Sequence, residues 1–343
     1  MKEGLFNPKY VFFESRALDY PLGRELYKKF KESNTMVMMT TSHNQVRGIP
    51  GETEIEKYRN AKKTLVIGVR KTLKFEQSLP SAEYALPLST GCMGECQYCY
   101  LQTTMGSKPY IRIYVNLEEI LDATKAYIEE REPDLTRFEA ACTSDPVSLE
   151  HIHGALKRTI EFMANQANGR LRFVTKYTNV EPFLNIKHNK HTYFRFSINA
   201  DYVIKNFEAN TSSFFDRILA ASKIAKAGYP LGFIIAPLMI FDNWKEGYSE
   251  LLSKLKANIP EDIHDEIYFE LITHRFTKAA KKIILQRYPK TKLEMDEEKR
   301  KVKWGKYGKF KYIYPDDEYS ELKNYMYHEI NSFFPKAKIE YFT

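Results

Sequence analysis

The residues best suited to chemistry lie in the stretch STGCMGECQYCYLQTT, which holds three of the four cysteines: Cys92, Cys96 and Cys99. The stretch is polar and rich in glycine, which argues against three buried structural thiols. A structural zinc ion takes four protein ligands, so a zinc site would need a further ligand from a distant part of the chain. A cubane four-iron four-sulfur (4Fe-4S) cluster held by three thiolates keeps one iron open, and an open coordination position is typical of catalytic metal centres. The spacing therefore indicates a metal centre and leaves both possibilities.

The composition of the whole chain excludes several classes of protein. Hydrophobic residues make up 43% of the 343 positions, which is enough for a large core. Four cysteines are too few for a disulfide scaffold, the N-terminal segment has no signal-peptide pattern, and no apolar run approaches the roughly 20 residues that span a bilayer. We therefore expect a cytoplasmic protein with reduced thiols and no membrane association. The net charge of +8 favours a polyanionic partner such as nucleic acid.

Strands alternate with helices through the middle of the chain, which predicts parallel βαβ units. Six segments read as strands, namely EYALPLS, RFEAACTS, LRFVTKY, TYFRFSINA, LGFIIAPLMI and DEIYFELITH. Six repeats predict a partial (β/α)6 TIM-type barrel, with an open doubly wound sheet as the alternative. Between the second and third strands we expect one helix over residues 149–168, with Gly169 just past its end. Chemistry in such folds sits at the carboxyl ends of the strands, where the cysteine stretch and the segments CTSDP, TKY, SIN and APL fall.

Two further regions flank the predicted barrel over residues 85–290. Residues 1–84 read as an α/β extension, with strands at YVFFE, MVMMTT and TLVIGV and a helix at GRELYKKFKE. Residues 291–343 read as a β-hairpin with GKYG near its tip, followed by a helix and a short strand. Residues 299–311 contain seven Lys or Arg and no acid, so the hairpin is either a solvated basic face or a nucleic-acid contact.

The motifs together resemble a known family. The Cys-x3-Cys-x2-Cys spacing, with an aromatic residue before the last cysteine, is similar to the signature of radical S-adenosylmethionine (SAM) enzymes. With ACTSDP, VTKY, FRFSIN, FIIAPL and KWGKYGKFKY in the same order, the chain resembles the spore photoproduct lyase family from about residue 10 onward. The resemblance implies a carbon–carbon lyase that repairs the DNA lesion 5-thyminyl-5,6-dihydrothymine to two thymines.

The resemblance also implies the cofactors and the hydrogen carriers. Three thiolates hold the 4Fe-4S cluster, S-adenosyl-L-methionine chelates the open iron, and its 5′-deoxyadenosyl radical takes a hydrogen from the lesion. Cys142 then returns a hydrogen to the product radical, which its weak S–H bond suits, although a lone cysteine is more often a buried core residue. Tyr98 and Tyr100 pass the hydrogen back towards 5′-deoxyadenosine, with ordinary packing as their alternative role.

Further residues are assigned to binding by the same resemblance. Residues expected to line the SAM site are Tyr98, Ser144, Lys176, Ser197 and Ala236, with Asn199 and Asp145 as weaker candidates. Lys306 and Tyr307 are expected to contact the lesion, whose two bases must leave the stack before the chemistry. An Arg often occupies the position of Lys306 in the family, and a lysine binds phosphate without the bidentate fork.

The expected partners complete the prediction. The resemblance implies DNA containing the spore photoproduct, an electron donor of the flavodoxin or ferredoxin type, and a location in the spore core. The sequence pattern favours a monomer. Two alternatives stay open: another radical SAM enzyme acting on nucleic acid or protein, and a zinc-dependent nucleic-acid-binding protein. The content of iron and zinc distinguishes them.

Overall fold

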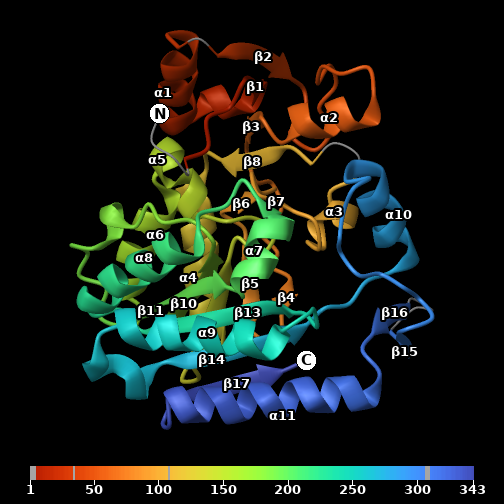
Figure 1. Cartoon of the computed structure of the whole chain (residues 1–343). Coiled ribbons are helices and arrows are strands. Elements are labelled where there is room, and N and C mark those ends of the chain that lie inside the picture. The colour runs from red at the N-terminus through yellow and green to blue at the C-terminus, as the bar shows by residue number, and fades with distance from the viewer. Residues whose placement is uncertain (1–4, 34, 107–108, 306–309) are drawn as a thin grey trace. The chain divides into compact units, whose positions relative to one another are not determined.

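The computed structural model describes residues 5–33, 35–106, 109–305 and 310–343. The chain divides into two compact units, one of Met1–Met93 and Met105–Tyr193 and the other of Gly94–Thr104 and Phe194–Thr343 (Figure 1). Among the described residues, no helix is long and apolar enough to cross a membrane.

The first unit begins with a mainly parallel sheet whose strand order is β2-β1-β3-β8-β6. Its strands are β1 (Tyr10–Glu14), β2 (Met36–Thr40), β3 (Thr64–Gly68), β8 (Ile111–Tyr114) and the short antiparallel β6 (Ser89–Thr90). Strands β1 and β3 are buried along their whole length, as their continuous apolar runs predict. Helices α1 (Pro21–Lys31) and α2 (Glu54–Ala61) belong to this part. The predicted strands and the helix of the extension are confirmed, whereas β8 and α2 were not predicted.

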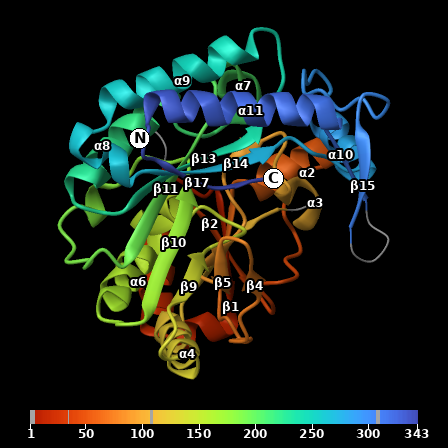
Figure 2. The ribbon, with the colours of Figure 1, turned by 90° about the horizontal axis from the view of Figure 1, so that it is seen from below.

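A second set of strands in the first unit has the order β10-β9-β5-β4 (Figure 2). These strands are β4 (Gln77–Ser78), β5 (Ala82–Leu86), β9 (Thr136–Ala140) and β10 (Gly169–Thr175). Strands β5, β9 and β10 are parallel, whereas β4 is antiparallel to β5. Helix α4 (Leu117–Glu130) precedes β9, and helices α5 (Glu150–His153) and α6 (Ala155–Ala164) lie between β9 and β10. The first three predicted barrel strands are therefore confirmed.

The single helix expected over residues 149–168 is wrong. Gly154 adopts a left-handed conformation with φ of +64° and separates α5 from α6. The Glu150 carboxylate accepts hydrogen bonds from the backbone nitrogens of Leu156 (2.9 Å) and Lys157 (3.3 Å), so it satisfies N–H groups that the first turn of α6 leaves unbonded. Gly169 begins β10 instead of ending the helix.

The second unit carries parallel strands in the order β11-β13-β14-β17. They are β11 (Thr192–Ile198, in this unit from Phe194), β13 (Leu231–Leu238), β14 (Tyr268–Thr273) and β17 (Lys338–Phe342). The helices are α3 (Leu101–Thr104), α7 (Asp201–Phe207), α8 (Phe214–Lys226), α9 (Trp244–Asn258), α10 (Lys278–Arg287) and α11 (Asp316–Phe333). Helix α11 packs on β17 through Tyr319 and Tyr327, whose rings contact Phe342. All six predicted strands are present, and β17 extends the parallel set.

Two small antiparallel pairs complete the second unit. Strand β7 (Glu95–Cys96) pairs with β12 (Glu208–Ala209). Strand β15 (Lys301–Trp304) pairs with β16 (Phe310–Ile313), which confirms the predicted hairpin. The predicted tip residues Lys306 and Tyr307 lie outside the described residues.

A buried ion pair joins two strands of the second unit. Nη1 of Arg195 on β11 lies 2.9 and 2.8 Å from the two carboxylate oxygens of Glu270 on β14, and both side chains are buried. The hydroxyl of Tyr341 on β17 donates to the same carboxylate at 2.5 Å. Gly232 on β13 is the register partner of Arg195, and a Cβ there would lie 2.4 Å from the Tyr268 ring. The ion pair and the Tyr341 hydroxyl therefore link β11, β14 and β17. Gly232, on the β13 strand between β11 and β14, has no side chain.

Replacing Arg195 by Met should leave the Glu270 carboxylate buried without its cation and cost about 3–5 kcal/mol of unfolding free energy. Urea unfolding measures this cost. The matched control is Lys254→Met, which removes an exposed ion pair with Glu250 on α9 and should cost less than about 1 kcal/mol. Equal losses in the two variants would contradict the importance of the buried pair.

Candidate active site

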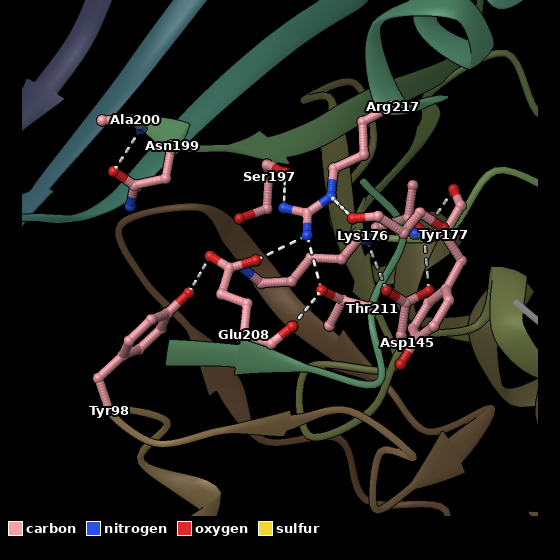
Figure 3. A network of polar contacts seen from close by, with 12 residues as sticks. Tyr98, Asp145, Lys176, Tyr177, Ser197, Asn199, Ala200, Glu208, Thr211 and Arg217 are labelled. Atoms are coloured by element: carbon pink, nitrogen blue, oxygen red, sulfur yellow. Dashed lines mark hydrogen bonds and ion pairs between the residues drawn. The ribbon is translucent and has the colours of Figure 1, made fainter. Parts of the chain in front are cut away.

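In the first unit, Asp145 ties the segment after β9 to the end of β10. Its carboxylate accepts from the Thr175 hydroxyl at 2.8 Å and from the Lys176 backbone nitrogen at 2.8 Å (Figure 3). Burial raises the pKa of Asp145 from 3.8 to about 6, even though these hydrogen bonds act to lower it. Two of the predicted site positions, Asp145 and Lys176, are thus in direct contact.

The segment after β9 also fixes the position of Gly91, the residue before Cys92. The Ser144 hydroxyl donates to the Gly91 carbonyl at 2.5 Å, and the Gly91 nitrogen donates to the Thr143 carbonyl at 2.8 Å. Gly91 has a φ of +80°, and a Cβ there would lie 2.4 Å from the Tyr110 carbonyl oxygen. Only glycine fits this position, so the start of the cysteine stretch is fixed against the end of β9.

Cys142 follows β9 and is half-buried. Its Sγ lies 3.2 Å from the Glu139 carbonyl oxygen and 3.3 Å from the Ser78 hydroxyl on β4. The thiol therefore has polar neighbours, unlike a cysteine that only fills an apolar core. Ser78 was not predicted, because its link to Cys142 spans 64 positions of sequence and no local motif marks it.

In the second unit, a buried ion pair orients Tyr98. The Tyr98 hydroxyl donates to Glu208, whose carboxylate lies 2.7 Å from Nη2 of Arg217 (Figure 3). Arg217 also donates to the Ser197 carbonyl at 2.9 Å and to the Thr211 hydroxyl at 2.8 Å. Burial, followed by the negative charge of Glu208, raises the pKa of Tyr98 well above its usual value, so the phenol stays protonated.

The backbone of the cysteine stretch is held by the same part of the second unit. Cys96 is the register partner of Glu208 in the β7–β12 pair, and the Gln97 nitrogen donates to the Phe207 carbonyl at 2.9 Å. The Gln102 side chain donates to the Cys96 carbonyl at 3.0 Å. Cys96 is buried and Cys99 half-buried, whereas Tyr100 is 56% exposed.

The remaining predicted SAM-site residues of this unit lie at strand ends. Ser197 is buried near the end of β11, and Ala236 lies near the end of β13. The Asn199 side chain donates to the Pro237 carbonyl at 2.8 Å, so it joins these two strand ends. Glu208 and Arg217 were not predicted, since neither belongs to a motif and the contact of Glu208 with Tyr98 spans 110 positions.

The three clustered cysteines have the donor chemistry of a metal centre. All four cysteines of the chain are described and none forms a disulfide, so thiolates are available. Cys92 belongs to the first unit, whereas Cys96 and Cys99 belong to the second. Within the described ranges, no three His, Cys, Asp or Glu side chains are gathered as a ready metal site. The fit therefore rests on donor chemistry, because three thiolates suit an iron–sulfur cluster.

Solved structures at high identity share this architecture. A spore photoproduct lyase variant with bound AdoMet and dinucleoside spore photoproduct is 57% identical, with a TM-score of 0.96 over 98% of this chain and 99% of that chain. A spore photoproduct lyase complexed with dinucleoside spore photoproduct is 58% identical, also with a TM-score of 0.96 over 98% of this chain and 99% of the other. The likeness confirms the predicted fold class, an α/β protein of the partial-barrel type.

The sequence comparisons agree with the structures. The family model described as spore photoproduct lyase matches residues 6–343. The spore photoproduct lyase of Bacillus subtilis (strain 168) is 61% identical over 338 residues, which are 98% of this chain and 99% of that protein. The spore photoproduct lyase of a Geobacillus species (strain Y412MC61) is 59% identical over 338 residues, which are 98% of this chain and 99% of that protein. The chain belongs to the spore photoproduct lyase family. The resemblance and the enzyme class, a radical SAM lyase, are confirmed.

The raised pKa of Asp145 predicts a pH-dependent stability. Between about pH 4 and pH 6 the unfolded chain ionises this carboxyl while the folded chain keeps it protonated, so the contribution of Asp145 to stability falls as pH rises and is constant above that window. Asp145→Asn does not titrate. The unfolding free energy of the variant, relative to that of wild type, should therefore rise by about 2 kcal/mol between pH 4 and pH 7.

Urea unfolding at several pH values checks this gain. Asp122→Asn, which removes an exposed carboxylate on α4, is the matched control. A gap between wild type and Asp145→Asn that is the same at pH 4 and pH 7 would contradict the assignment.

Proposed function

We propose that this radical SAM lyase converts the spore photoproduct in DNA to two thymines. The observation that carries the proposal is its 57% identity, over nearly the whole length of both chains, to a structure with bound AdoMet and dinucleoside spore photoproduct. A protein of this fold with an activity outside this family would need different residues at its functional site.

Cys92, Cys96 and Cys99 are the residues that would hold a 4Fe-4S cluster. When bound, the cluster and SAM together supply a carbon-centred radical that abstracts hydrogen. SAM is oriented at the strand ends by Tyr98, Ser144, Lys176, Ser197 and Ala236. Lys176 suits this role because Asp145 fixes its backbone and its ammonium can pair with a carboxylate.

Cys142 supplies the hydrogen that completes the product. Its S–H bond breaks, a C–H bond forms at the methylene carbon of the thymine radical, and the unpaired electron stays on sulfur. Ser78 and the Glu139 carbonyl hold the thiol in one place during this transfer. The polar contacts of the thiol support this role over simple core packing.

Tyr98 restores the thiol. Its O–H bond breaks, the S–H bond of Cys142 re-forms, and the unpaired electron moves to the phenol oxygen. Before the transfer the Tyr98 hydroxyl donates to Glu208, which Arg217 holds, so this hydrogen bond must break when the hydrogen moves to sulfur. Tyr100 is the second hydrogen carrier of the proposal. Its O–H hydrogen restores the Tyr98 phenol, and Tyr100 would recover a hydrogen from 5′-deoxyadenosine, so that no radical remains on the protein.

The partners follow from the same proposal. Lys306 and Tyr307 contact the lesion from the hairpin tip. A flavodoxin or ferredoxin type of protein donates the electron, and the enzyme works as a monomer in the spore core. The net charge of +8 supports an anionic partner.

Metal analysis with turnover tests the proposed function. Protein reconstituted without oxygen should hold about four iron atoms per chain and convert a dinucleoside lesion to two thymidines with SAM and a reductant. A Cys96→Ala variant should lose both iron and turnover. Zinc in place of iron, with no lesion conversion, would support the nucleic-acid-binding alternative instead.

Replacing Cys142 by Ala should separate the two halves of the reaction. SAM cleavage should continue, because the cluster thiols are intact, but most of the product should no longer be thymine. Chromatography with mass spectrometry measures both. Ser78→Ala is the matched control: it removes one hydrogen bond of about 1 kcal/mol and should slow turnover by less than about tenfold with normal products. Normal thymine at the full rate from Cys142→Ala would refute the donor role.

A further inference from the structure

Three cations gather beside the described strands of the basic hairpin. Lys303 on β15 and Lys311 on β16 are direct cross-strand partners, so their side chains lie on the same face of the hairpin. Arg275 follows β14, and its neighbour Phe276 pairs with Tyr312 of β16 through two backbone hydrogen bonds of 3.1 and 2.8 Å. Arg275 is thereby held beside the two lysines.

These cations repel one another in the isolated protein. Like charges directly opposite on paired strands are destabilising. Burial, followed by the charges of Arg275 and Lys303, lowers the pKa of Lys311. Over the described parts of the chain, no ion pair is found for any of the three, whereas Lys301 pairs with Asp316 at 2.6 Å. The cluster thus has an uncompensated positive charge, which an anion would neutralise.

The cations line a groove that also carries an aromatic side chain. The groove has a volume of about 660 Å³, and Arg275, Lys303, Lys311 and Trp304 all line it. Trp304 is 70% exposed, which is unusual for a tryptophan. Its ring centroid lies 5.4 Å from that of Phe310, so one neighbour supports the ring while most of its surface remains accessible. An exposed ring beside cations is the arrangement that binds a nucleic-acid strand by stacking and by phosphate contact.

We propose that the Arg275–Lys303–Lys311 cluster binds a backbone phosphate of the DNA strand flanking the lesion, and that Trp304 stacks on a base of that strand. The inference rests on the proposed function, since it takes DNA as the substrate. The joined thymine bases are uncharged, whereas each backbone phosphate carries a negative charge, so a cluster of three cations favours the backbone. The groove is therefore a DNA contact in addition to the predicted lesion contacts of Lys306 and Tyr307.

The test compares a long substrate with a minimal one. The variant is Arg275→Gln/Lys303→Gln/Lys311→Gln in the full-length, cluster-loaded protein. Fluorescence anisotropy measures binding to a lesion-containing duplex between about 50 and 200 mM salt, and chromatography measures turnover of the dinucleoside lesion. The matched control, Lys28→Gln/Lys226→Gln/Lys256→Gln, removes three exposed charges from α1, α8 and α9.

The expected result is a selective loss of DNA affinity. The variant should bind the duplex roughly tenfold or more weakly at low salt, with a salt slope reduced by about one to two, while dinucleoside turnover stays unchanged. Trp304→Ala should weaken binding to single-stranded DNA by roughly tenfold, and Trp304→Phe should retain most of it. The control should keep nearly all of the affinity of wild type.

Other outcomes would overturn the assignment in distinct ways. If the triple variant bound the duplex as tightly as the control variant does, the cluster would not be a phosphate-binding site. Loss of dinucleoside turnover in the triple variant would place these residues at the lesion itself. Binding of a glutamate polymer as tight as that of DNA would make the groove a general anion site. Failure of the wild-type protein on the dinucleoside would refute the proposed function, whatever the groove binds.

Discussion

The buried Glu208–Arg217 ion pair is the interaction on which the second unit's part of the site depends. Two charges removed from water are costly unless further hydrogen bonds satisfy them. Arg217 meets this requirement by donating to the Ser197 carbonyl, and Glu208 meets it by accepting from Tyr98. The backbone of Glu208 pairs with Cys96. One ion pair thus fixes a strand end, the Tyr98 phenol and the backbone of Cys96 together.

Periodicity predicted the elements well where each one is long and uniform. All six barrel strands appear where the apolar patterns placed them, and helix α11 follows the hairpin as expected. The helix break at Gly154 was missed, because the cap that stabilises the second segment comes from Glu150, a residue that also reads as helical. Strand β8 was missed because its signal is a run of four residues and its partner β3 lies far away in sequence.

Sequence motifs predicted which residues carry the chemistry. The residues that position them could be identified only from the three-dimensional structure. Cys142 and the three clustered cysteines stand out by type and spacing. Ser78 and Glu208 do not, since their contacts with Cys142 and Tyr98 span 64 and 110 positions. A serine or glutamate of this kind is indistinguishable from an ordinary surface residue until folding brings the partners together.

The opposed lysines of the hairpin have a consequence for its order. Repulsion between Lys303 and Lys311 weakens the pairing of β15 with β16 in the isolated protein. A bound anion removes this repulsion and so stabilises the strand pairing. By thermodynamic linkage, the formed pairing increases the affinity for the anion by the same free energy. If the hairpin binds DNA as proposed, strand pairing and DNA binding therefore strengthen each other.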